Sequence, residues 1–258
     1  MERDPGAAVA RVVMNRPEAR NAVSLAMIDE LVSALGDLAV DDGARALVLA
    51  GEGKDFCAGA DLTDVTMTDA EHDFARSFEG LVEAIETHPW PVIAEVQGAA
   101  LGAGCQIVVA CDLAIAANEA RLGIPSARLG LLINYENIER LLRAVGKKRA
   151  GEILYAARVV SGTEAAVWGL VNETVPSGDL RTRCMDSAAA IADLAPLSVR
   201  GSKRGIGAAV GRSALDRAAD GGLLADFEMM AAAAFGSDDL REGIDAFRER
   251  RPPRFRGR

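Results

Sequence analysis

The stretch IAEVQGAALGAGCQIVVACDL (residues 93–113) joins an apolar segment to a run of glycine and alanine and then to a second apolar segment. We expect a strand over 91–98, a short helix over 103–110 and another strand over 112–117. Small residues between a strand and a helix let the backbone approach another group closely. Gln106 is the first polar side chain after the small residues, on a segment whose other residues are typical of a buried helix.

The first half of the chain repeats this order of strand, turn and helix. Segments 7–15 and 46–51 predict strands, and segments 24–40 and 68–86 predict helices that begin at Ser24 and at a Thr68/Glu71 capping box. Alternating strands and helices indicate an α/β layer arrangement. The second half is mostly helical in pattern, with helices expected over 134–146, 147–156, 161–169, 178–194, 198–210, 213–235 and 238–250. Ala195-Pro196 interrupts the pattern, so we expect an α/β core over 1–195 and a helical C-terminal region over 196–258.

Composition limits the function classes. The chain has 258 residues, half of them hydrophobic, and a net charge of −9, which disfavours a nucleic-acid surface. No apolar run is long enough to span a membrane, and the charged start does not match a signal peptide, so we expect a cytoplasmic protein with free thiols. The four cysteines show no metal-ligand pairing and the two histidines lie far apart, so we expect no metal site. The basic tail at 248–258 has two interpretations, a solvated tail or a contact to phosphate.

Two loops are candidates for chemistry, CAGADL (57–62) and ALGAGCQ (100–106). Each consists of small residues after a strand-like segment, and the second opens a helix, whose first N–H groups lack partners within the helix. Two such N–H groups converging on one oxygen would form an oxyanion hole suited to a thioester enolate. Either loop alone is more typical of close packing of a helix on a strand, because clusters of glycine and alanine are common.

The two loops occur in a longer set of segments that closely resembles the enoyl-CoA hydratase/isomerase (crotonase) family. The segments are RPEARNA (16–22), FCAGADL (56–62), IAEVQGAALGAGCQIVVACDL (93–113), RLGIPSARLGL (121–131), RLLRAVG (140–146), SGTEAAVWGLVNE (161–173) and FGSDDLREGIDAF…R (235–250). The resemblance implies the crotonase (ClpP-like) α/β fold, a spiral of ββα turns with a helical C-terminal trimerisation region. It also implies homotrimers or hexamers and a CoA thioester as substrate or ligand, with no further cofactor.

The resemblance places the family's functional positions on this chain. The oxyanion donors fall on the N–H groups of Ala60 and Ala103. The positions that contact CoA or substrate fall on Ala19, Asp61, Leu62, Thr63, Asn134, Tyr135, Phe247 and Arg250, the last two toward the CoA of a neighbouring subunit.

The chain departs from the family pattern at the two glutamates that hydratases use. Their positions match Gln106 and Ser126, and neither side chain can act as a carboxylate. Asn134 matches a position where some relatives place a working aspartate, and Glu136 is the nearest replacement carboxylate, although Asn134 and Glu136 also fit the capped first turn of a helix. For the remaining candidates we expect a surface or turn position for His88, packing for Cys105, and solvated or structural roles for Asp64 and Glu95.

These patterns leave two functions open. The first is an acyl-CoA-binding protein of lipid metabolism with weak or absent hydratase activity, which resembles mycobacterial family members that lack both glutamates. The second is an active enoyl-CoA hydratase, or an isomerase or hydrolase that uses Glu136 or Tyr135. A purely structural oligomer is disfavoured, because both backbone-donor loops are intact.

Overall fold

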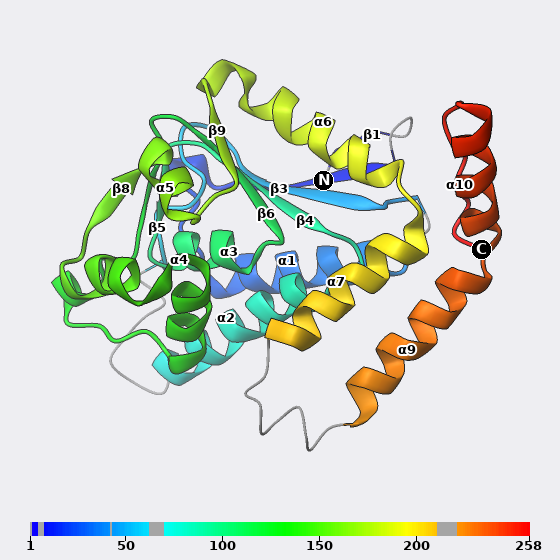
Figure 1. Ribbon diagram of the computed structural model, residues 1–258. Coiled ribbons are helices and arrows are strands. Elements are labelled where there is room, and N and C mark those ends of the chain that lie inside the picture. The colour runs from blue at the N-terminus through cyan, green and yellow to red at the C-terminus, as the bar shows by residue number, and fades with distance from the viewer. Residues whose placement is uncertain (1, 5–7, 42, 62–69, 211–220) are drawn as a thin grey trace.

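A six-stranded sheet forms the centre of the computed structural model, which describes residues 2–4, 8–41, 43–61, 70–210 and 221–258 (Figure 1). The order is β1-β2-β3-β4-β6-β9, and among these strands only β1 runs antiparallel to its neighbour. The strands are β1 (Glu2–Asp4), β2 (Val9–Met14), β3 (Ala46–Gly51), β4 (Val92–Val96), β6 (Leu113–Ala117) and β9 (Glu173–Val175). Parallel neighbours need crossover connections, so the predicted α/β arrangement is confirmed.

Helices cover both faces of this sheet. In Figure 1, α1 (Leu25–Ala39) and α2 (Ala70–Thr87) lie below the sheet, and α6 (Leu180–Ala192) lies above it, against β2, β3, β4 and β6. As predicted, α1 begins at Ser24, whose hydroxyl accepts the N–H of Met27. The Thr68/Glu71 capping box lies outside the residues whose side chains are described.

A second, smaller sheet carries the glycine- and alanine-rich stretch. It contains β5 (Ala99–Leu101), β7 (Arg121–Gly123) and β8 (Val159–Ser161) in the order β5-β7-β8, and α3 (Ala103–Ala110) follows β5 directly. The chain passes from β4 to β5 through Gly98, which has a φ of +53°. A Cβ at Gly98 would collide with the carbonyl oxygen of Lys54, so only glycine fits this turn.

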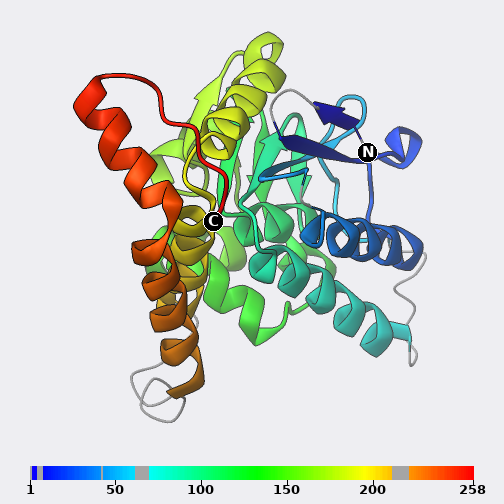
Figure 2. The ribbon, with the colours of Figure 1, turned by 90° about the vertical axis from the view of Figure 1, so that its right-hand side faces the viewer.

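The second half is mostly helical, as predicted, and its last helices extend away from the sheet (Figures 1 and 2). Residues 213–220 of the helix predicted over 213–235 lie outside the described residues. Gly146, with a φ of +75°, interrupts α4 at the predicted end of the first helical segment. Ser161 caps α5 and Gly169 ends it in the left-handed conformation, which agrees with the helix predicted over 161–169. The helices are α4 (Tyr135–Tyr155), α5 (Gly162–Trp168), α7 (Pro196–Val210), α9 (Gly221–Gly236) and α10 (Asp238–Glu249). The end of α6 and the start of α7 flank Ala195, and the division into two regions there stays a prediction.

The arginines of the basic tail are exposed to solvent, but the tail is held to α10 by hydrogen bonds. The carboxylate of Asp239 accepts the backbone N–H groups of Arg256 and Gly257 at 2.6 and 2.7 Å, and the carboxylate of Glu242 accepts the side chain of Arg251. The tail therefore folds back along α10. A contact between the tail and phosphate stays a prediction.

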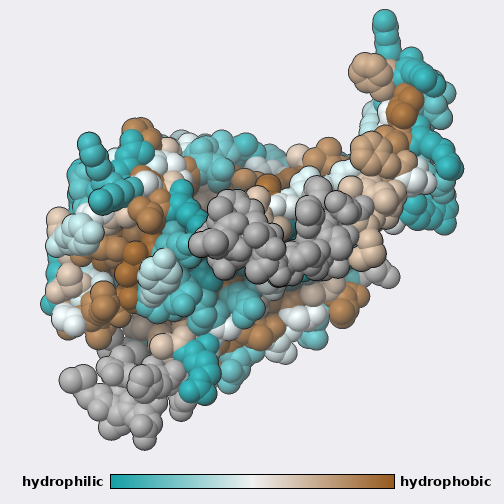
Figure 3. Space-filling view, turned by 60° about the horizontal axis from the view of Figure 1, so that its bottom comes forward, coloured by the Kyte–Doolittle hydropathy of each residue, from teal (hydrophilic) through white to brown (hydrophobic). Residues whose placement is uncertain are grey.

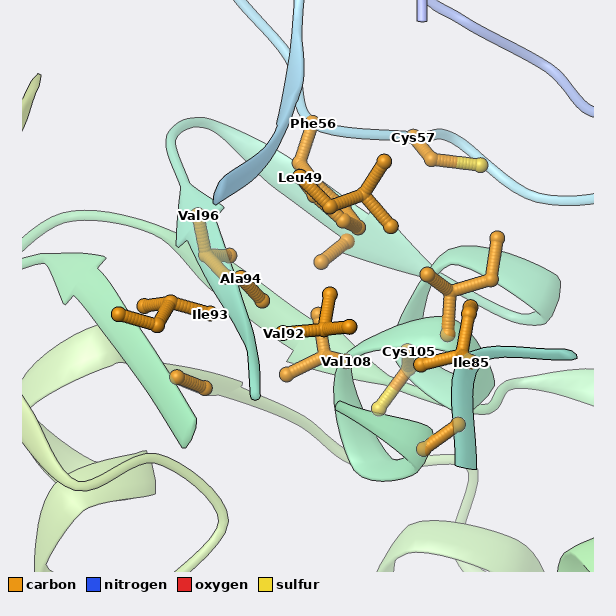
Figure 4. Close-up of a cluster of buried hydrophobic side chains, with 14 of the residues drawn as sticks. Leu49, Phe56, Cys57, Ile85, Val92, Ile93, Ala94, Val96, Cys105 and Val108 are labelled. Carbon is orange, nitrogen blue, oxygen red and sulfur yellow. The ribbon is translucent and has the colours of Figure 1, made fainter. Parts of the chain in front are cut away.

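The core is built from aliphatic side chains and lies between the large sheet and the helices. Figure 4 shows part of it, where Leu49 of β3 lies beside Phe56, and Val92 of β4 lies beside Val108 and Cys105 of α3. This packing fixes α3 against the sheet. It therefore also fixes the place where α3 begins.

Candidate functional site

The loop after β3 is joined to β5 by backbone hydrogen bonds. Cys57 N–H donates to the carbonyl of Ala99 at 2.9 Å, and Leu101 N–H donates to the carbonyl of Cys57 at 3.0 Å. This short parallel bridge brings together the two loops that the sequence marks as backbone donors. Figure 4 shows Cys57 on the loop above α3, which carries Cys105.

The two loops meet at a pair of glycines. Gly59 has a φ of +130° and Gly102 a φ of +55°, both in the region that favours glycine. A Cβ on Gly102 would lie 3.7 Å from the Cα of Gly59, and a Cβ on Gly59 would lie 3.4 Å from the carbonyl oxygen of Leu101. The backbones are therefore in contact, and the residue after each glycine is a predicted oxyanion donor.

The direction of the Ala60 N–H follows from its own peptide group. The carbonyl of Gly59 accepts the N–H of Val23 at 2.8 Å. In a trans peptide the C=O and the next N–H point in opposite directions, so the Ala60 N–H points away from Val23. That side is where β5 and α3 lie, because Cys57 pairs with β5. Within the described part of the chain, the Ala60 N–H donates no hydrogen bond.

The same argument gives the direction of the Ala103 N–H. The carbonyl of Gly102 accepts the N–H of Gln106 at 3.1 Å and so points along α3. The Ala103 N–H of that peptide then points out of the N-terminus of the helix, where the helix dipole is positive. It also has no partner among the described residues. Unpartnered N–H groups on two adjoining loops are what an oxyanion hole needs, and their joint use for one oxygen stays a prediction.

Gln106 lies one turn along α3 from Ala103, and its side chain is unusual for a buried amide. The residue is 8% exposed, yet its amide makes no hydrogen bond to the described part of the chain. Its polar atoms are not sealed from solvent either. Buried amides nearly always have hydrogen-bond partners. The unpartnered amide of Gln106 is therefore available to bind a ligand.

Ser126 reaches the same end of the small sheet. Gly102 N–H donates to the carbonyl of Gly123, which anchors the start of α3 to β7, and Ser126 begins a 3₁₀ turn three residues after Gly123. Its hydroxyl makes no hydrogen bond to the described residues. Gln106 follows β5 and Ser126 follows β7, so the pairing of these two strands fixes the segments that carry both residues.

Comparison with known proteins settles the family. The family model for enoyl-CoA hydratase/isomerase matches residues 4–258. The chain belongs to the enoyl-CoA hydratase/isomerase family. A relative from Thermus thermophilus is 39% identical over 255 residues, covering 96% of this chain and 97% of its own. The 2,3-dehydroadipyl-CoA hydratase of Escherichia coli is 31% identical, covering 97% of this chain and 96% of its own.

Solved structures confirm the predicted crotonase fold. An enoyl-CoA hydratase from Mycobacterium smegmatis superimposes with a TM-score of 0.88 at 33% identity, covering 98% of this chain and 97% of its own. An enoyl-CoA hydratase from Bacillus anthracis gives 0.86 at 32% identity, covering 97% and 96%.

Asn134, another position taken from the family pattern, is engaged by the protein itself. It caps α4, and its side-chain oxygen accepts the N–H of Asn137 at 3.2 Å, as the capping interpretation predicts. Its amide nitrogen donates to Glu79 at 2.9 Å. Tyr135, 71% exposed, and Glu136, also exposed, follow on the first turn of α4 and point to no described partner.

Glu79 and Arg140 form a clasp between α2 and α4 that the sequence did not reveal. Arg140 donates to Glu79 at 2.5 and 3.1 Å and also to Glu86. Burial raises the pKa of Glu79, but the hydrogen bonds from Arg140 and Asn134 outweigh it and hold that pKa below the usual range. The clasp joins residues 61 positions apart, and no local pattern connects them.

The other predicted positions lie at the edges of the site or on the C-terminal helices. Ala19 ends a 3₁₀ turn beside the loop that Cys57 opens, and Asp61 directly follows Ala60. Leu62, Thr63 and Asp64 lie outside the described residues. Phe247 is 85% exposed near the end of α10, and Arg250 follows that helix with a φ of +56°. Both are remote in sequence from the oxyanion loops and lie on the projecting helices.

The expectations for three titratable groups are confirmed, and for His88 the structure selects the turn over the surface. Cys105 is fully buried, and burial raises the pKa of its thiol to about 12, which agrees with a packing role. Glu95 is structural, because its carboxylate accepts two hydrogen bonds from the buried Arg11. His88 is in a turn but not on the surface, because the backbone N–H of Trp90 satisfies its Nδ1 inside the protein. Burial also lowers the pKa of His88.

Lys203 connects the C-terminal helices to the segment that follows α3. Its buried ammonium donates to the carbonyls of Ile85 and Trp90 at 3.1 Å and to the carboxylate of Asp112 at 2.6 Å. All three N–H donors of the ammonium are used. In the described part of the chain, no group of His, Cys, Asp and Glu could hold a metal ion. No described helix is long and apolar enough to cross a membrane.

Proposed function

We propose that this protein binds acyl-CoA thioesters and hydrates enoyl thioesters weakly or not at all. The observation that carries the proposal is the pair of unpartnered N–H groups at Ala60 and Ala103, with the uncharged amide of Gln106 one helical turn away. The backbone donors suit a thioester carbonyl. The side chains around them do not suit the addition of water.

The chemistry explains this division. Hydration needs a proton delivered to one carbon and a water activated at the next. An amide accepts no proton near neutral pH, and the buried His88 is held in the turn before β4. A positioned acid or base contributes roughly 10² to 10⁴ in rate, whereas one oxyanion donor contributes roughly 10² to 10³. Replacing both carboxylates therefore removes more of the hydration rate than of thioester binding.

The names of the relatives support the ligand class. The relative from Escherichia coli is named a 2,3-dehydroadipyl-CoA hydratase, and the solved structures are named enoyl-CoA hydratases. We extend the CoA thioester to this chain as its ligand, with no additional cofactor, and propose a role in fatty acid and lipid metabolism. A cytoplasmic location belongs to the same proposal, supported by the four free thiols.

An oligomer, a homotrimer or a hexamer, is also part of the proposal. Large apolar side chains are exposed along α9 and α10, among them Met229, Phe235 and Phe247. Figure 3 shows these C-terminal helices projecting from the body with apolar surface uncovered. The two helices border a groove of about 630 Å³, which is lined by Phe235, Leu240, Ile244, Phe247 and Phe255. A second copy would cover this surface and bring Phe247 and Arg250 toward the neighbour's ligand; sedimentation equilibrium tests it, and a stable monomer would contradict it.

Two measurements test the proposed function. Calorimetry with palmitoyl-CoA should show binding, and no binding up to millimolar ligand would contradict the proposal. Crotonyl-CoA should be hydrated far below the roughly 1 to 10³ per second that is usual for enzymes. A rate within that range would favour the active hydratase instead.

A double variant separates the two explanations for weak hydration. Gln106→Glu with Ser126→Glu should raise the hydration rate if the missing carboxylates alone limit it. A gain that requires Glu136 or Tyr135, lost on Glu136→Gln or Tyr135→Phe, would instead assign acid–base chemistry to the first turn of α4.

A further inference from the structure

We propose that the ion pair between Arg16 and Asp61 holds the Ala60 N–H in the direction that its own peptide gives it, and thereby gives the site its preference for a thioester carbonyl. The proposal rests on the proposed function and adds a positioning element to it. Neither side chain needs to touch the ligand for this role. Arg16 acts through Asp61, and Asp61 acts through the peptide that precedes it.

Arg16 holds the loop on which Asp61 lies. Its guanidinium donates from both terminal nitrogens to one carboxylate oxygen of Asp61, each at 3.1 Å. One of these nitrogens also donates to the carbonyl of Ala22 at 3.1 Å. The backbone N–H of Arg16 donates to the side chain of the buried Asn21 at 2.9 Å. Asn21 therefore holds the backbone of Arg16, and the carbonyl of Ala22 helps to hold its guanidinium against Asp61.

Asp61 is held by both its backbone and its side chain. Its N–H donates to the carbonyl of Val23 at 2.8 Å, while its carboxylate receives Arg16. On the other side of Ala60, the carbonyl of Gly59 accepts the N–H of Val23, also at 2.8 Å. Ala60 lies between these two fixed points, so the orientation of its N–H depends on both.

Gly59 makes this restraint necessary. Its φ of +130° lies in a region open to glycine, and glycine has the widest backbone freedom of any residue. The peptide that carries the Ala60 N–H can therefore rotate unless its far side is held. The pair between Arg16 and Asp61 holds that side and leaves the N–H directed at the oxyanion site.

The exposure of the pair favours local positioning over global stability. The side chain of Arg16 is 35% exposed and that of Asp61 is 17% exposed. Ion pairs with this much solvent contact contribute little to folding. The planar guanidinium, however, reaches Asp61 and the carbonyl of Ala22 together, which a lysine ammonium on its flexible stem does less well.

The test compares two ligands that differ only at the carbonyl, dodecanoyl-CoA and S-dodecyl-CoA. The second is a thioether with a methylene in place of the carbonyl. Two backbone hydrogen bonds to the carbonyl should make the wild-type protein bind the thioester roughly tenfold more tightly. Asp61→Asn and Arg16→Gln should each bring the affinity ratio close to one, because each weakens thioester binding more than thioether binding. The double variant should lose no more than either single variant, because both remove one interaction.

Arg143→Gln is the matched control. Arg143 pairs with Glu139 at 2.6 Å on α4, away from the loops of Arg16 and Asp61. Its removal should leave the affinity ratio as it is in the wild type. Arg16→Lys, which keeps the charge, should restore part of the ratio lost in Arg16→Gln.

The outcomes distinguish the positioning role from the function. A wild-type ratio above one that persists in Asp61→Asn and Arg16→Gln would overturn the positioning role and leave the proposed function standing. Equal loss of both ligands in those variants would also overturn it, because the pair would then be only structural. Failure of the wild-type protein to bind either ligand would overturn the proposed function itself.

Discussion

Gly104 of α3 lies directly against Cys57 of the loop after β3. A Cβ added at Gly104 would overlap the carbonyl oxygen of Cys57 and lie 2.9 Å from its Cβ. The contact explains why the small residues continue into α3 beyond the turn. They let the helix start against the loop that supplies the other N–H donor.

Gly104→Ala should therefore move α3 away from the loop. Because the atom in the way is backbone and cannot rotate aside, the free energy of unfolding should fall by about 1 to 3 kcal/mol. Affinity for palmitoyl-CoA should fall as well. Gly36→Ala, in an exposed position of α1 with nothing near its Cβ, should instead stabilise the protein by about 0.5 to 1 kcal/mol. Urea denaturation measures both changes, and equal effects would contradict the packing argument.

Lys203→Met should destabilise the protein by about 3 kcal/mol, because it leaves the partly exposed carboxylate of Asp112 without the buried cation that pairs with it. Adding Asp112→Asn should recover part of the loss. Burial already raises the pKa of Asp112 against the effect of Lys203. A raised folded pKa penalises the ionised form, so the deficit of Lys203→Met should shrink as the pH falls and Asp112 becomes protonated. A deficit independent of pH would contradict this assignment.

Asn134→Asp should also be destabilising, by about 1 to 3 kcal/mol. The variant loses the side-chain N–H that donates to Glu79, and its new carboxylate faces the carboxylate of Glu79. Two adjacent carboxylates raise the pKa of one of them, so the loss should lessen on acidification. Asn134→Ser keeps a capping oxygen without the charge and should cost less. Urea denaturation at pH 7 and pH 5 measures the three proteins, and a neutral Asn134→Asp would show that Glu79 does not restrict this position.

The thiols near the oxyanion loops should be unreactive. Burial raises the pKa of both Cys57 and Cys105 to about 12, so both stay protonated at pH 8. Iodoacetamide should label neither in the native protein and both after unfolding, as read by peptide mass spectrometry. Because the unfolded thiols ionise first, stability should fall as the pH rises from about 9 toward 12. Rapid native labelling of Cys105 would contradict its packing role.

The sequence predicted the features that depend on local patterns. The strand, turn and helix order, the caps at Ser24 and Ser161 and the break at Gly146 all follow from residues within a few positions of each other. The two donor loops were also predicted, since small residues and a helix start mark them. The structure added the reason for the free N–H groups, which is the hydrogen bonding of the carbonyls in the same two peptides.

Long-range polar pairs could not be predicted in the same way. Arg16 and Asp61 are 45 positions apart, and Lys203 and Asp112 are 91 apart, so only the folded chain brings them together. For His88 the sequence left a surface position and a turn position open. Its place inside depends on a hydrogen bond to the backbone of Trp90 that no composition rule indicates.

The infrared carbonyl stretch of a bound thioester tests the central claim most directly. The ligand is palmitoyl-CoA with ¹³C at the thioester carbonyl, and its difference spectrum reports only that bond. If the N–H groups of Ala60 and Ala103 both donate to its oxygen, the stretch should move to lower frequency on binding than in water. A bound ligand whose carbonyl stretch stays at or above its frequency in water would contradict the assignment of these two residues as an oxyanion hole.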